Sequence, residues 1–176
     1  MAELFSTERI IPKLRARDKR DVLSKLATTM SRDAQLPVAE IVETVLQTAD
    51  LPAFGPRAGV ALPHALIPGL RRPIASFARL HPPIDFGAVD GTRTDLVALL
   101  LSPNESPGEH LRALAWIARR LRDADVRSLL RASQRPDTMY VVLLGGHAPR
   151  VRSCPDAEAP YGKEATGRYG PEAPDR

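Results

Sequence analysis

The chain has 176 residues, a net charge of +4 and a hydrophobic content of 43%, which together suit one folded domain with a sizeable core. A single cysteine, Cys154, excludes an internal disulfide framework, and no Cys/His spacing fits a zinc site. We therefore predict neither a metal nor a cofactor. No apolar run is long enough for a membrane span, and residues 1–5 lack the basic-then-apolar pattern of a secretory signal. We expect a cytoplasmic protein.

The excess positive charge comes mostly from arginine, which is spread over several segments. Such a charge can attract an acidic partner or a nucleic acid. The sequence shows no helix-turn-helix, zinc-finger or RNP aromatic pattern. We therefore favour arginines on solvated faces and expect no nucleic-acid partner.

The first half of the chain predicts an extended segment followed by two structural helices. Residues 3–15 are expected to be extended. Asp18 is the expected N-cap of the first helix, and Pro37 suits the first turn of the second. The apolar residues at helical spacing are Val22, Leu23, Leu26, Ala27 and Met30 in the first helix, and Val38, Ile41, Val42, Val45 and Leu46 in the second.

The stretch from Gly55 to Gly69 encloses a short apolar run, Val60–Leu62, between glycines and prolines. We predict a short strand here that ends at Pro63 and His64. Proline restricts the preceding residue to extended geometry, so His64 should leave the strand end in a narrow range of directions. A histidine held this way can act as a nucleophile when its ring is neutral, or can simply form a hydrogen bond at the strand end. The local sequence is compatible with either role.

Strands and helices alternate in the second half of the chain. The alternating pattern of 74–80 predicts a strand near a sheet edge, ended by His81 and the two prolines that follow it. The continuous apolar run 96–101 is typical of a strand buried on both faces. We expect a loop at 102–107 and then a helix whose buried face carries Leu111, Leu114, Ala115, Ala118 and Leu121.

The C-terminal part predicts one more short helix and then a tail. Asp125 is the candidate N-cap of that helix. Residues 138–144 are ambiguous, because Val141 and Val142 favour a strand. From residue 146 proline, glycine and charge dominate, so we predict a single domain at 1–145 and a disordered tail at 146–176. The whole pattern indicates an α/β domain of two or three layers.

The segment G-V-A-L-P-H at 59–64 resembles the phosphorylation-site segment of enzyme IIA proteins of the fructose/mannitol type (type 2), and most closely their nitrogen-regulatory branch. These proteins belong to the bacterial phosphoenolpyruvate-dependent phosphotransferase system. The likeness continues through 83–91, the strand 95–101 and the helix E-H-L-R-A-L-A from Glu109, and it covers about residues 5–144. The resemblance implies a mixed β-sheet flanked by helices, and a closing helix at 138–144.

The resemblance also implies a function. A phosphocarrier of this type accepts a phosphoryl group on His64 from an HPr-like phosphocarrier protein and passes it on. A regulatory, nitrogen-type output would add regulatory target proteins as partners. His110 opens the helix at Glu109 and is implied to stabilise the phosphoryl group, since a helix start favours anions. The remaining histidines, His81 and His147, are expected to be incidental.

One departure from the family pattern bears on transfer. Many relatives carry an Arg-Glu pair upstream of the histidine and then Ser-Thr-Gly, where this chain has Thr48 and Ala49 and then 53–55 (A-F-G). Arg57 is our candidate for the missing positive charge, the alternative being an exposed loop arginine. The loss supports a second hypothesis, a non-catalytic regulatory binding module that has lost efficient phosphorylation. The upstream carrier, the regulated target or sugar, and the oligomeric state are left open at this stage.

Overall fold

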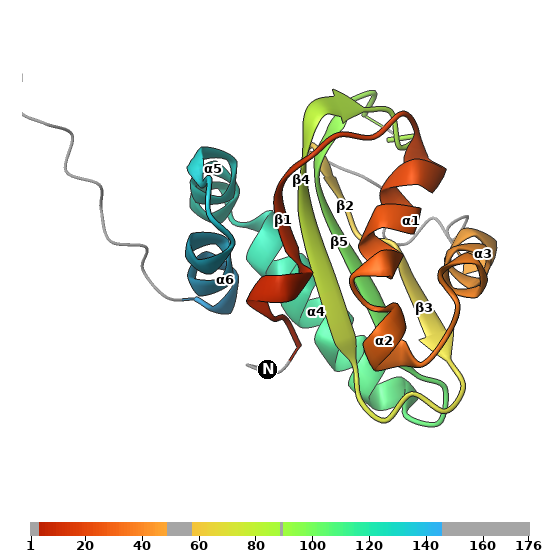
Figure 1. Ribbon diagram of the computed structural model, residues 1–176. Coiled ribbons are helices and arrows are strands. Elements are labelled where there is room, and N and C mark those ends of the chain that lie inside the picture. The colour runs from red at the N-terminus through yellow and green to blue at the C-terminus, as the bar shows by residue number, and fades with distance from the viewer. Residues whose placement is uncertain (1–3, 49–57, 89, 146–176) are drawn as a thin grey trace, which may run out of the picture.

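The computed structural model describes residues 4–48, 58–88 and 90–145, which form a mixed five-stranded sheet between two layers of helices (Figure 1). The predicted α/β class with a mixed, helix-flanked sheet is therefore confirmed. The first half holds η1 (Thr7–Arg9), β1 (Ile10–Leu14), α1 (Lys19–Thr28), α2 (Ser31–Ala34) and α3 (Val38–Thr48). The second half holds β2 (Val60–Ala61), β3 (His64–Ile67), β4 (Ile74–Ile84), β5 (Thr94–Pro103), α4 (Pro107–Arg122), α5 (Ala124–Ala132) and α6 (Pro136–Leu144).

The strand order is β1-β4-β5-β2, and β3 also pairs with β5, beyond β2. β1 runs parallel to β4, β4 runs antiparallel to β5, and both β2 and β3 run parallel to β5. The predicted edge position of 74–80 is wrong, because the N-terminal segment forms β1 beside β4 and encloses it. The predicted end at His81 is also wrong: β4 reaches Ile84 through a register shift after Arg79. Prolines are tolerated at such an irregularity because they interrupt no regular ladder.

Each face of the sheet has its own hydrophobic core, so the domain has three layers. Helices α1, α2 and α3 cover one face, and α4, α5 and α6 cover the other (Figure 1). β5 contributes to both cores by alternation: Val97, Leu99 and Leu101 to the first, and Leu96, Ala98 and Leu100 to the second. The prediction that this run is buried on both faces is confirmed.

The helix ends follow capping chemistry. The Asp18 side chain accepts a hydrogen bond from the Asp21 backbone N–H at 2.8 Å, which confirms the predicted N-cap of α1. For α5 the predicted cap, Asp125, is wrong, because the Asp123 carboxylate accepts from the backbone N–H groups of Asp125 and Val126. Residues 138–144 belong to helix α6, as the family resemblance implied.

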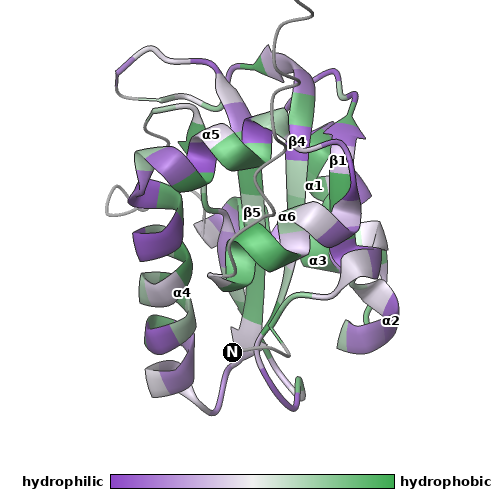
Figure 2. Ribbon diagram, turned by 90° about the vertical axis from the view of Figure 1, so that its left-hand side faces the viewer, coloured by the Kyte–Doolittle hydropathy of each residue, from purple (hydrophilic) through white to green (hydrophobic). Residues whose placement is uncertain are grey.

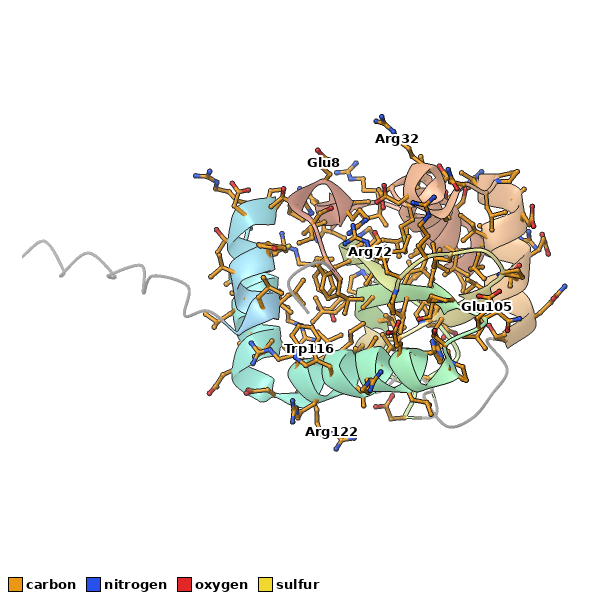
Figure 3. The ribbon with its side chains drawn as sticks, turned by 90° about the horizontal axis from the view of Figure 1, so that it is seen from below. Glu8, Arg32, Arg72, Glu105, Trp116 and Arg122 are labelled. Atoms are coloured by element: carbon orange, nitrogen blue, oxygen red, sulfur yellow. The ribbon has the colours of Figure 1, made fainter. Side chains whose placement is uncertain are left out.

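The buried face of α4 differs from the predicted one. Leu111 is 60% exposed and Ala115 is exposed as well, whereas His110, Ala113 and Ile117 are buried along with Leu114 and Leu121. Figure 2 shows α4 with green and purple residues on different sides of the helix. In Figure 3 Trp116 lies on the side of α4 that faces the sheet, where it packs on the second core, and Arg122 points away from it. The helix is rotated so that its first turn brings a histidine into the core.

The central stretch also differs from the prediction. His64 does not end a strand before a loop but opens β3, so β2 and β3 follow one another along β5. Pro63 cannot donate to the ladder, yet its carbonyl accepts from the Leu100 N–H at 3.0 Å. The chain therefore stays beside β5, and the proline interrupts the strand without diverting it.

No helix in the described part of the chain is long and apolar enough to cross a membrane. The predicted tail at 146–176 lies outside the described residues, and so does Arg57.

Candidate functional site

Two histidines from separate elements meet on one face of the sheet. His64 lies opposite Leu100 in the β3–β5 register, and Leu100 belongs to the core beneath α4. His110 projects from the first turns of α4 into the same layer. Their ring centroids are 5.3 Å apart, with ring planes inclined at 41°. The structure thus brings together the predicted acceptor and the predicted stabilising residue, which are 46 positions apart in the sequence.

The backbone of its own segment orients the half-buried ring of His64. Its Nδ1 lies 3.0 Å from the carbonyl oxygen of Leu62, two residues earlier. A carbonyl oxygen only accepts hydrogen bonds, so Nδ1 carries the proton and donates it. In the neutral ring the lone pair then resides on Nε2. Nε2 is therefore the ring nitrogen with a lone pair available for the predicted attack on phosphorus.

Thr48 supports the same segment from the last position of α3. Its hydroxyl lies 2.7 Å from the His64 carbonyl oxygen, the shortest of its three carbonyl contacts. This hydrogen bond joins the end of a helix to the residue predicted to carry the nucleophile. The position that the family pattern would fill with arginine thus holds a neutral side chain that is hydrogen-bonded to the backbone of His64.

His110 is nearly buried, with 8% of its surface exposed. Its Nδ1 lies 3.0 Å from the hydroxyl oxygen of Ser102, a fully buried residue near the end of β5. Its backbone N–H is used within the helix start, where it donates to the Ser106 carbonyl at 3.2 Å. In Figure 1 the end of β5 and the first turn of α4 lie at the same, lower end of the molecule.

Burial lowers the pKa of His110 below its ordinary value, and the nearby His64 ring lowers it further. Both causes disfavour the charged imidazolium: the first because it loses water, the second because two positive rings would repel. Both therefore favour the neutral form of the His110 ring. A neutral ring with one N–H can donate a hydrogen bond to an anionic oxygen next to His64.

The site has the parts that phosphoryl transfer to a histidine needs. A neutral imidazole supplies a lone pair, and a second ring beside it can donate to phosphoryl oxygens. The described residues contain no group of three or more metal-ligating side chains, so nothing in that part of the chain offers a metal site.

Comparison with known proteins agrees with this geometry. Residues 3–145 match the family model of the phosphoenolpyruvate-dependent sugar phosphotransferase system, EIIA 2. The chain belongs to this family. A nitrogen regulatory protein of Bradyrhizobium diazoefficiens is 39% identical over 143 residues, which cover 81% of this chain and 94% of the relative. One from Pseudomonas aeruginosa is 33% identical over 72% of this chain and 82% of the relative.

Solved structures show the same EIIA fold. The nitrogen regulatory protein IIA-Ntr of Neisseria meningitidis superposes with a TM-score of 0.76 at 25% identity, over 81% of this chain and 97% of that one. A mannitol IIA from Escherichia coli, solved in complex with phosphorylated mannitol IIB, has a TM-score of 0.66 at 17% identity, over 80% of this chain and 97% of that one. The predicted membership among EIIA phosphocarriers related to nitrogen regulatory proteins is confirmed.

Sequence reasoning about this EIIA domain missed the two hydroxyl groups of the site. Ser102 was expected in a loop, but it continues the row Leu96, Ala98, Leu100 on the α4 face of β5. That period of two was the signal that could have found it. Thr48 was noted only as a missing arginine. Its contact with His64 joins residues 16 positions apart, which no local pattern reveals.

Proposed function

We propose that His64 of this EIIA domain accepts a phosphoryl group from an HPr-like phosphocarrier in the cytoplasm, and that the output is regulatory, of the nitrogen type. The observation that carries the proposal is the pairing of the His64 and His110 rings at 5.3 Å, with Nδ1 of His64 bound to the Leu62 carbonyl. The similarity to nitrogen regulatory proteins over most of the chain supports the regulatory output.

In the transfer step Nε2 of His64 attacks phosphorus in line with the donor's leaving atom. A P–N bond forms at Nε2 while the bond from phosphorus to the donor atom breaks, and the donor atom keeps that electron pair. No proton has to leave His64, because its proton sits on Nδ1. The ring becomes more positive as Nε2 is phosphorylated, and the hydrogen bond to the Leu62 carbonyl strengthens accordingly.

His110 acts on the other side of the phosphoryl group. A phosphoryl group on His64 would add negative charge beside a neutral, nearly buried ring. An N–H aimed at this charge stabilises it more than water would, because the donor is already oriented before the reaction. The start of α4 adds favourable dipolar charge at the same place.

The same site supports a second candidate function, a regulatory module that binds its partner with little phosphorylation. The specific observation is Thr48, whose neutral hydroxyl engages the His64 carbonyl at the position where many relatives have arginine. A site with less positive charge stabilises a transferring phosphoryl group less well. The two candidates differ in rate, so a transfer measurement separates them.

The experiment incubates the purified chain with enzyme I, HPr and phosphoenolpyruvate and follows intact mass. We expect a gain of one phosphate that is labile in acid and absent from His64→Ala. His81→Ala is the matched control, since His81 is an exposed histidine on β4. No gain under conditions that fully modify another EIIA protein would leave the binding module as the better reading.

A further inference from the structure

Ser102 is a fully buried polar residue next to the site, and neither the family comparison nor the mechanism above gives it a role. It lies opposite Leu66 in the β3–β5 register, two residues beyond the partner of His64. Its hydroxyl is 3.0 Å from Nδ1 of His110. This contact joins the sheet to the first turns of α4 at the point where the histidine rings meet.

The direction of this hydrogen bond follows from counting donors. If Nδ1 of His110 donated to the serine, the hydroxyl hydrogen would need another acceptor, and within the described residues the only hydrogen-bond contact of Ser102 Oγ is His110. A buried hydroxyl without an acceptor is costly. If the hydroxyl donates to Nδ1 instead, its hydrogen is satisfied and the histidine proton sits on Nε2.

We propose that Ser102 is a positioning residue that holds His110 in the Nε2–H form, so that this N–H faces the phosphoryl group on His64. The inference rests on the proposed phosphorylation of His64. The two rings are then in complementary tautomers. His64 has its proton on Nδ1 and its lone pair on Nε2, whereas His110 has its lone pair on Nδ1, engaged by serine, and its proton on Nε2.

The complementary arrangement has a chemical consequence. A His110 ring protonated on Nδ1 would point the Nε2 lone pair at the phosphoryl oxygens and repel them. Ser102 therefore contributes to transfer without touching the substrate, by selecting which nitrogen of His110 carries the proton. The hydroxyl also fixes the ring plane, which keeps the donor oriented.

The test compares Ser102→Ala with a matched control, Ser76→Ala. Ser76 is also fully buried, on the neighbouring strand β4, but among the described residues its hydroxyl contacts the Arg9 carbonyl and the Thr29 hydroxyl and neither histidine. Ser102→Thr retains the hydroxyl and serves as the conservative variant. The wild type and all three variants are labelled with ¹⁵N-histidine, and the NMR spectrum reports which ring nitrogen carries the proton. Transfer from phosphorylated HPr is measured on the same samples.

We expect the wild type and Ser76→Ala to show His110 as the Nε2–H form, and Ser102→Ala to show a mixture of both tautomers. Transfer should slow about tenfold in Ser102→Ala, the scale of losing one orienting hydrogen bond, and should recover at least in part in Ser102→Thr. A merely structural serine would give similar effects in both alanine variants, with the tautomer unchanged.

Two results would overturn the inference. One is a wild-type His110 protonated on Nδ1, and the other is a Ser102→Ala protein with wild-type tautomer and rate. Failure of the proposed function looks different: the wild type would not be phosphorylated at all, while the spectrum still showed the Nε2–H form of His110.

Discussion

The two ends of β5 hold polar networks of opposite character. At the start of the strand, the Asp95 carboxylate binds the Arg131 guanidinium through two hydrogen bonds of 2.7 Å. Arg131 also donates to the Ala58 carbonyl at 3.1 Å, and Arg79 donates to the Arg131 carbonyl. At the end of the strand lie two histidine rings, held by hydrogen bonds to a carbonyl and a hydroxyl. Figure 1 shows α5, which carries Arg131, at the upper end and the start of α4 at the lower.

The contrast between the two networks indicates that the first contributes to stability and the second to reactivity. In the upper network, formed by Ala58, Asp95 and Arg131, each charge has an opposite partner, and the Asp95 hydrogen bond raises the pKa of Arg131. Such paired charges hold secondary-structure elements together, and their hydrogen-bonding groups are already occupied within the protein. In the histidine pair of His64 and His110, the described hydrogen bonds go to a carbonyl and a hydroxyl, and burial lowers the pKa of His110. An N–H of the His110 ring can therefore respond to a new negative charge.

The largest expected effect is on transfer at the lower end. His110→Ala should slow phosphorylation of His64 about a hundredfold, because it removes one oriented donor from the phosphoryl group. The measurement is single-turnover transfer from phosphorylated HPr. His81→Ala, the exposed control on β4, should keep the wild-type rate. Equal transfer rates in the two variants would show that His110 does not stabilise the phosphoryl group.

The next effect belongs to the upper network and should appear in stability. Arg131→Ala leaves the Asp95 carboxylate, whose side chain is only 19% exposed, without its partner. We expect the free energy of unfolding to fall by about 1–3 kcal/mol, between the values for exposed and buried pairs. Urea denaturation measures it, with Arg135→Ala as the control for an exposed pair. A variant of normal stability that transfers slowly would contradict the separation of roles.

The variant Arg57→Ala tests the predicted source of positive charge for the phosphoryl group. It is predicted to lend charge to the phosphoryl group, although it lies outside the described residues. The backbone of Gly59, two positions after Arg57, is hydrogen-bonded to the start of β5. His64 lies five positions after Gly59, roughly 16 Å along extended chain. We therefore expect Arg57→Ala to slow transfer only about tenfold, the lower part of the range for a lost donor.

Thr48→Arg in the Arg57→Ala background sharpens this test. The new charge should restore part of the rate, and the lost hydrogen bond to the His64 carbonyl should keep the recovery partial. A wild-type transfer rate in Arg57→Ala alone would contradict the predicted contribution of Arg57 to the phosphoryl site.

The smallest effect is the pH dependence of stability from His110. The pKa of His110 is lower in the folded protein than in the unfolded chain, where it is about 6.5. The unfolded chain therefore binds more protons between the two pKa values. This contribution to stability is present above the unfolded pKa and is lost as pH falls toward the folded one. Urea denaturation from pH 8 to pH 5 should show a shallower slope for His110→Gln, and an unchanged slope would contradict the burial argument.

Much of the fold and part of the site follow from local sequence. The apolar run at 96–101 predicts a strand buried on both faces, and Asp18 predicts a helix start, because both depend on neighbours within a few residues. The motif at 59–64 identifies His64 by resemblance. The structure also explains why glycine occupies position 59 of this motif. Gly59 has φ +77°, and an added Cβ would lie 2.7 Å from side-chain atoms of both Arg131 and Asp95.

Only the tertiary structure decided which residues meet. The interior place of β4 depends on β1, which pairs with it from about 67 residues away. The burial of His110 in place of Leu111 depends on how α4 is rotated against the sheet, since spacing along a helix does not say which stripe faces the core. The Ser102–His110 and Thr48–His64 contacts join separate elements. Local patterns determine where strands and helices form, whereas packing between them determines which side chains meet.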